Sequence, residues 1–199
     1  MCIERRRCPA AQRGATLPEL IIFIVIVGVG IVGILSVLDF SVRHSADPMV
    51  RKQMLAIAES LLEEVEAMPF TYCDPTDANV ETAGRADLGA GGCATTVEVL
   101  GPEPGETRSS TTPFNNVNDY YLSGGYALPS PITDIGGGNP APAGYSATIV
   151  VAAEALNAIA SDSTAANMNA LRIAVTVAHG GDSLTMEGYR TRHSPNMAQ

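Results

Sequence analysis

Residues 13–38 decide the fold, and they read RGATLPELIIFIVIVGVGIVGILSVL. From Leu20 to Leu38 there is no charged residue, and Ser36 carries the only polar side chain. At about 1.5 Å of rise per residue, a helix over this run covers about 28 Å, close to the thickness of a bilayer's hydrocarbon core. Buried helices of globular proteins rarely stay apolar on every side for so long. The run therefore predicts a transmembrane helix.

The charges before the apolar run predict its orientation. Residues 1–14 carry one acid, Glu4, and four arginines, which are Arg5, Arg6, Arg7 and Arg13. Positive charge flanking a membrane helix favours the cytoplasmic side. We therefore expect a single-pass protein with a cytoplasmic N-terminus and with its C-terminal part on the other side of the membrane.

Two small residues that could form a cleavage site, Gly14 and Ala15, precede the apolar run. In a secretory signal peptide, the small residues at the cleavage site follow the apolar region. No comparable small-residue pattern follows Leu38, where the chain continues Asp39-Phe40-Ser41. A cut at Gly14–Ala15 would leave the membrane helix in the mature protein.

Glu19 is a carboxylate at the start of the apolar run, where a charge is costly and usually marks function. A local interpretation is the capping box T-x-x-E formed with Thr16, in which Glu19 accepts a hydrogen bond from a free backbone N–H. A second interpretation pairs Glu19 with the α-amine that cleavage would create on Ala15 of a neighbouring copy. The two interpretations are compatible.

This junction resembles the prepilin signature of type IV pilins and of the pseudopilins of type II secretion. The resemblance implies that a prepilin peptidase cuts Gly14–Ala15, that Ala15 is N-methylated, and that Glu19 guides assembly into a helical filament of pilin subunits. Residues 1–14 would then be the prepilin leader peptide, and residues 15–38 the transmembrane and assembly helix. Alanine stands where the family most often has phenylalanine or methionine.

Three further segments resemble minor pilins of the mannose-sensitive haemagglutinin (MSHA) pilus, the MshD-like group. They are residues 45–53 together with 56–64, residues 114–121, and residues 187–192. The resemblance implies a minor pilin, a structural subunit of a type IV pilus. Such a subunit would lie in the bacterial inner membrane with its C-terminal domain in the periplasm before it enters the pilus filament. The alternatives are a type II secretion pseudopilin and a membrane-tethered periplasmic binding module that uses loops within residues 101–144.

Composition limits the partners. The sequence has 199 residues and a net charge of −9, and removal of the arginine-rich leader would make the mature chain more acidic still. Such a chain repels nucleic acid, so no nucleic-acid partner is expected. No G-x-S-x-G or H-E-x-x-H motif is present, and we expect neither an enzyme nor a cofactor.

The cysteines divide by compartment. Cys2 and Cys8 belong to the leader, whereas Cys73 and Cys93 would face an oxidising periplasm and form the only obvious pair there. Zinc is the alternative, but no histidine or further cysteine lies nearby in the sequence. A disulfide over a loop of this length stabilises the fold by about 3 kcal/mol in the chain-entropy model.

The exported part predicts an α+β fold in which a long helix packs on an antiparallel sheet, as in pilins. An amphipathic helix over residues 39–69 would continue the spine, with an apolar stripe from Met54 to Met68. Asp47-Pro48 resembles an N-cap followed by a first-turn proline, so we expect the helix to restart or kink there.

Residues 70–199 are expected to form the periplasmic sheet domain. Alternating apolar residues predict strands over residues 95–100, 145–151 and 171–177. Gly180-Gly181 predicts a two-residue hairpin turn that pairs Val177 with Leu184, Val175 with Met186 and Thr176 with Thr185. Residues 101–112 and 129–144 read as exposed loops, and residues 154–170 as either a short helix or another excursion.

One polar segment offers a weak metal signal. Asn115, Asn118 and Asp119 carry oxygens suited to calcium, but a hydrogen-bonded turn is the commoner explanation. We therefore assign no metal site from the sequence.

Overall fold

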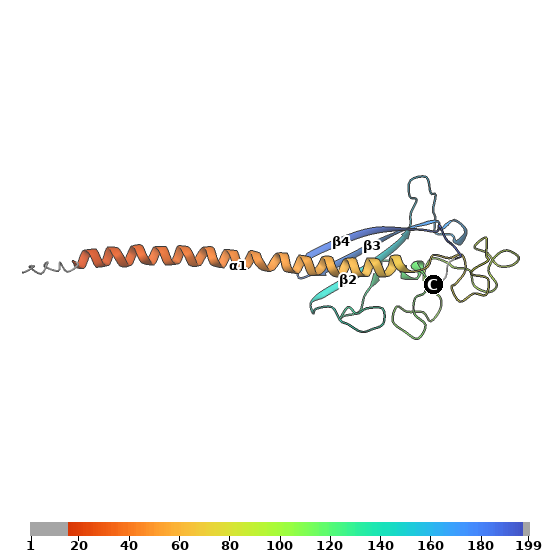
Figure 1. Ribbon diagram of the computed structural model, residues 1–199, viewed down its shortest axis with the longest axis horizontal. Coiled ribbons are helices and arrows are strands. Elements are labelled where there is room, and N and C mark those ends of the chain that lie inside the picture. The colour runs from red at the N-terminus through yellow and green to blue at the C-terminus, as the bar shows by residue number, and fades with distance from the viewer. Residues whose placement is uncertain (1–15, 197–199) are drawn as a thin grey trace, which may run out of the picture. The chain divides into compact units, whose positions relative to one another are not determined.

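The structure, a computed structural model, describes residues 16–196, apart from the side chains of residues 40–47. The chain divides into two compact units, one extending to Pro48 and one starting at Met49. The secondary structure is α+β, as predicted, with one long helix followed by a four-stranded antiparallel sheet (Figure 1).

Helix α1 spans Leu17–Ala67 and crosses from the first unit into the second. The restart predicted at Asp47-Pro48 is wrong, because the backbone is helical on both sides of Pro48 and through it. A proline inside a helix removes one backbone hydrogen bond, at a cost of about 3 kcal/mol.

Within the first unit, α1 is apolar and exposed. The side chains from Leu20 to Leu38 are exposed, and the one polar group, the Ser36 hydroxyl, donates a hydrogen bond to the Val32 carbonyl at 2.9 Å. This bond satisfies the hydroxyl inside the helix, so the segment presents a uniformly apolar surface.

In the second unit, α1 buries the predicted stripe. The buried helix residues are Met54, Ala58, Leu61, Leu62 and Val65. They pack in one core with apolar residues of the sheet, while the opposite face carries the exposed Lys52, Glu59 and Glu63. Figure 1 shows the strands running beside this part of the helix.

The sheet has the order β1-β2-β3-β4, with β1 at Tyr126–Ala127, β2 at Tyr145–Ala153, β3 at Ala170–His179 and β4 at Asp182–Thr191. The hairpin register is confirmed, since Val177 lies opposite Leu184, Val175 opposite Met186 and Thr176 opposite Thr185. Gly180, with φ of 61°, occupies the turn in a conformation that favours glycine. One face of β2 and β3 is fully buried.

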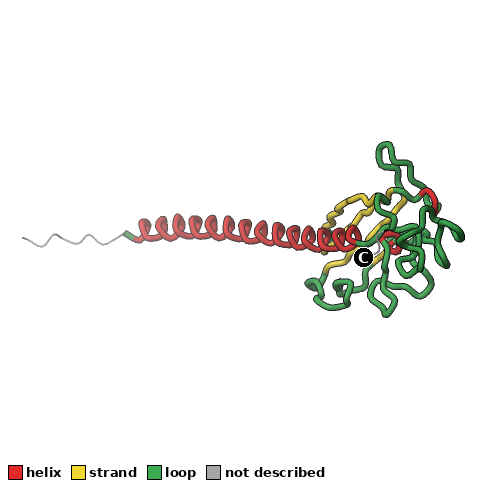
Figure 2. Tube along the Cα trace, turned by 45° about the vertical axis from the view of Figure 1, so that its right-hand side comes forward, coloured by secondary structure: helices red, strands yellow, loops and turns green. Residues whose placement is uncertain are grey.

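Loops make up most of the remaining chain (Figure 2). The strand predicted over residues 95–100 is wrong, since only an isolated bridge joins Val97 to Cys73. The backbone N–H groups of Thr95 and Thr96 instead donate to the Asp77 carboxylate, at 2.7 and 2.9 Å, and so are not free to form a ladder. The expected excursion over residues 154–170 extends to Asn169, because Ala170 already belongs to β3, and it contains a short 3₁₀ turn, η2, at Ala165–Asn167 and an isolated bridge between Leu156 and Ile159.

Candidate functional site

The predicted cleavage junction lies at the edge of the described chain. Gly14 and Ala15 are outside the described residues, so the structure does not place the cut or the N-methylation position. Glu19 lies in the first turn of α1, and its Oε2 accepts a hydrogen bond from the Thr16 backbone N–H at 3.4 Å. This contact agrees with the local capping interpretation. Glu19 is exposed, which leaves room for a second partner.

The apolar half of α1 is suited to a non-aqueous environment. An 18-residue stretch within Leu17–Asp39 has a mean hydropathy of 3.1, and none of that stretch is buried against the rest of the described chain. By length and composition this helix could cross a membrane. A Cβ atom added at Gly28, Gly30 or Gly33 would meet nothing within 4 Å. The whole surface of this segment is therefore available to lipid or to other helices.

The Cys73–Cys93 disulfide is present, with a Cα–Cα distance of 5.4 Å. Both cysteines are fully buried and form a small second core with Val80 and Ala83. The disulfide closes the loop that carries Asp77, whose carboxylate accepts four backbone N–H bonds. Burial alone would raise the pKa of Asp77, but these bonds outweigh it and hold the pKa well below its ordinary value.

A buried ion pair joins the helix to the loops. Arg108 donates from Nε and Nη2 to the two oxygens of Glu64, at 2.7 and 2.6 Å, and also from Nη2 to the Thr133 carbonyl at 2.9 Å. The Tyr120 hydroxyl donates to the same carboxylate at 2.7 Å. Burial and the neighbouring carboxylate of Glu64 raise the pKa of Tyr120, so it stays protonated.

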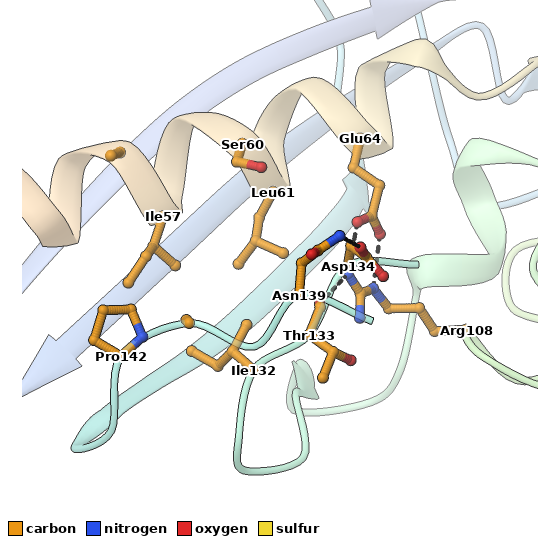
Figure 3. Close-up of a pocket in the computed structure, with 12 residues that line it drawn as sticks. Ile57, Ser60, Leu61, Glu64, Arg108, Ile132, Thr133, Asp134, Asn139 and Pro142 are labelled. Carbon is orange, nitrogen blue, oxygen red and sulfur yellow. Dashed lines mark hydrogen bonds and ion pairs between the residues drawn. The ribbon is translucent and has the colours of Figure 1, made fainter. Parts of the chain in front are cut away.

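A pocket of about 310 Å³ opens beside this ion pair, between α1 and the loop around residues 132–142 (Figure 3). Its apolar wall includes Ile57, Leu61, Ile132 and Pro142. The charged groups at its end are already engaged, because Glu64 and Arg108 satisfy one another. This pocket offers shape and apolar surface, and its lining also includes the Ser60 hydroxyl and the Asp134 carboxylate, which accepts hydrogen bonds from Gly138 and Asn139.

The second polar site is a cluster of carboxylates near η1, the 3₁₀ turn at Val117–Tyr120. One ligand oxygen from each of Glu98, Glu103 and Asp119 lies within 4.8 Å of the others, and the same holds for Asp74, Glu103 and Glu106. Burial, with the charges of Asp119 and Glu103, raises the pKa of Glu98 to about 10. Burial also raises the pKa of Glu103 to about 8 and that of Asp119 to about 6.

Asp119 belongs to the turn that the sequence predicted. Its Oδ2 accepts the backbone N–H groups of Asn115 and Asn116, at 2.9 and 2.8 Å, and Asn116 caps η1 in return. The hydrogen-bonded turn over residues 114–121 is therefore confirmed. Sequence reasoning missed Glu98 and Glu103, which no motif connects to this turn.

Comparison with protein-family models, with curated proteins and with solved structures found no match for this chain.

Proposed function

We propose that this protein is a minor pilin, a structural subunit of a type IV pilus that assembles through its N-terminal helix. The observation that carries the proposal is the apolar segment Leu17–Asp39, which is exposed along its length and has Glu19 at its start. A folded unit with its own core follows this segment. An exposed apolar helix of this kind needs either lipid or other helices around it. The helix of a pilin is surrounded by lipid before assembly and by the helices of other subunits in the filament.

The proposed path begins in the inner membrane. Prepilin peptidase removes residues 1–14 on the cytoplasmic side, and the α-amine of Ala15 becomes a cation at the depth of Glu19. In a staggered packing of helices, the carboxylate of one subunit pairs with the amine of the next. This pairing offsets the cost of a lone carboxylate in an apolar assembly.

A membrane-tethered periplasmic binding module is the second candidate, favoured by the pocket beside Glu64 and Arg108. A type II secretion pseudopilin would share the junction and the helix. Finding the protein in a type IV pilus or in a pseudopilus would distinguish these two possibilities. If the protein were found in neither filament, the tethered module would be favoured.

Substitution of Glu19 tests the proposal. We expect Glu19→Ala to be cleaved normally but to enter sheared filaments at least about tenfold less, because an unpaired amine remains in the assembly. Glu59→Ala, which removes an exposed acid from the same helix, is the matched control and should assemble normally. Wild-type incorporation of Glu19→Ala would reduce Glu19 to a helix cap.

A further inference from the structure

The carboxylate cluster near η1 contains polar atoms that the protein itself leaves unsatisfied. Glu98 is 0 % exposed and Asp119 is 1 % exposed. Glu98 Oε2, Asp119 Oδ1 and both carboxylate oxygens of Glu103 are buried without a hydrogen-bond partner. Buried polar atoms are nearly always paired, so a group of unpaired oxygens indicates a missing partner.

When the carboxylates are ionised, all of these unpaired atoms are hydrogen-bond acceptors or metal ligands. The amide oxygens of Asn115 and Asn118 are likewise buried and unpaired. Their orientation is fixed, because each amide nitrogen donates to a carboxylate, that of Asn118 to Glu98 at 2.7 Å and that of Asn115 to Glu106 at 3.0 Å. Rotating either amide would place an oxygen against a carboxylate oxygen. The missing partner is therefore positively charged or a donor.

No basic side chain supplies that charge. Among the described residues, no lysine or arginine forms an ion pair with Glu98, Glu103 or Asp119. Arg192 is the basic residue whose charge acts on Glu98, but its guanidinium stacks on Phe70, 4.5 Å from the ring centroid. The cluster is thus a buried acidic site whose three carboxylates form no ion pair with any described basic side chain.

Backbone hydrogen bonds tie together the segments that carry Glu98 and Asp119. The Glu98 N–H donates to the Tyr72 carbonyl at 3.0 Å, and the Gly101 N–H donates to the Asn118 carbonyl at 3.1 Å. The second oxygen of Asp119 accepts the two backbone bonds that order the turn. The site is therefore assembled before any ligand arrives, on segments tied to one another.

We propose that Glu98, Glu103 and Asp119 bind one calcium ion through their unpartnered oxygens. The donor set is entirely oxygen, without histidine or cysteine, which fits a hard cation and not zinc. Calcium accepts carboxylate and amide oxygens in an irregular shell, whereas magnesium requires a near-octahedral one and retains its water. Asp74 and Glu106 are less suited, since their oxygens already accept bonds from Thr76, Asn115 and the Glu103 backbone N–H.

High proton affinity at Glu98 and Glu103 is the expected behaviour of this site without its cation. Burial and mutual repulsion favour the neutral acids. A calcium ion would displace the carboxyl protons of Glu98 and Glu103, and the unpaired oxygens would become its ligands. The inference does not depend on the proposed function, because a pilin and a tethered binding module could each carry such a site.

Thermal unfolding of the full mature chain in detergent tests the site. Circular dichroism is suitable because the chain has no tryptophan. After treatment with a chelator, addition of about 1 mM calcium should raise Tm by about 5 °C or more, and titration calorimetry should find one ion per chain. Magnesium at the same concentration should have a much smaller effect.

Two variants locate the ion. The Glu103 carboxylate accepts no hydrogen bond, so Glu103→Gln removes none. Glu98→Gln introduces an amide that resembles the neutral form of the acid. Both variants should therefore fold in the presence of chelator. Each should lower calcium affinity at least about tenfold, whereas the control Glu59→Gln, on the exposed face of α1, should respond like wild type. The inference is overturned if calcium does not shift Tm of the wild type, if both variants retain wild-type affinity, or if magnesium is as effective.

Discussion

Arg108 and Glu64, 44 residues apart in the chain, meet in a bidentate ion pair with N–O distances of 2.7 and 2.6 Å. The Arg108 side chain is 2 % exposed and that of Glu64 is 14 % exposed. The pair connects α1 to a long loop that has no strand of its own. It therefore fixes where this loop lies on the helix and forms one end of the pocket (Figure 3).

Breaking this pair should be costly. We expect Arg108→Ala to lower the free energy of unfolding by about 3–5 kcal/mol, because it leaves the buried Glu64 carboxylate without its counter-charge. The measurement is denaturant unfolding of the mature chain in detergent. Arg172→Ala, which removes a partly exposed arginine paired with Glu154 and Glu187, is the control and should cost much less. Equal losses in the two variants would contradict the role assigned to the buried pair.

The disulfide predicts both a thiol count and a stability change. Before reduction, thiol labelling of the mature protein should find no free thiol, because Cys73 and Cys93 are bonded and the other two cysteines lie in the proposed leader. Replacing both bonded cysteines with alanine should cost about 3 kcal/mol. Reductant should lower the stability of the wild type and leave that of the double variant unchanged. In the labelling experiment, two reactive thiols found without reductant would contradict the prediction, because they would indicate an uncleaved leader or an open disulfide.

Asp77 predicts a pH-dependent stability. Because its pKa is lowered in the folded protein, its ionised form stabilises the fold at and above the unfolded pKa of about 3.9, and this contribution is lost as the pH falls towards the folded pKa. Asp77→Asn should therefore cost about 1–3 kcal/mol at pH 7 and progressively less below about pH 4. Thermal unfolding of both proteins from pH 7 to pH 3 checks this, and a difference that does not shrink on acidification would contradict it.

The elements fixed by local pattern could be predicted from the sequence. The β3–β4 register follows from alternation on both sides of Gly180-Gly181, since a slip of one residue would turn Val175 and Val177 away from the core. The buried stripe on α1 follows from its helical spacing. The strand expected over residues 95–100 failed because the Asp77 carboxylate, distant in sequence, takes the backbone donors that a strand would use.

The polar sites were less accessible to sequence reasoning. The Glu19 cap could be predicted, because its partner, Thr16, is three residues away. The sequence predicts the turn that contains Asp119. It does not predict the unpaired oxygen of Asp119, because the fold alone places Glu98 and Glu103 beside it. Such sites depend on loops whose paths are set by tertiary contacts, and no local pattern specifies them.

The intact mass of the protein purified from bacterial membranes tests the central claim most directly. The account predicts a chain that starts at Ala15, with or without one added methyl group, and keeps the apolar helix through Leu38. A mass that retains Met1, or a water-soluble product from which residues 15–38 have been removed, would contradict it.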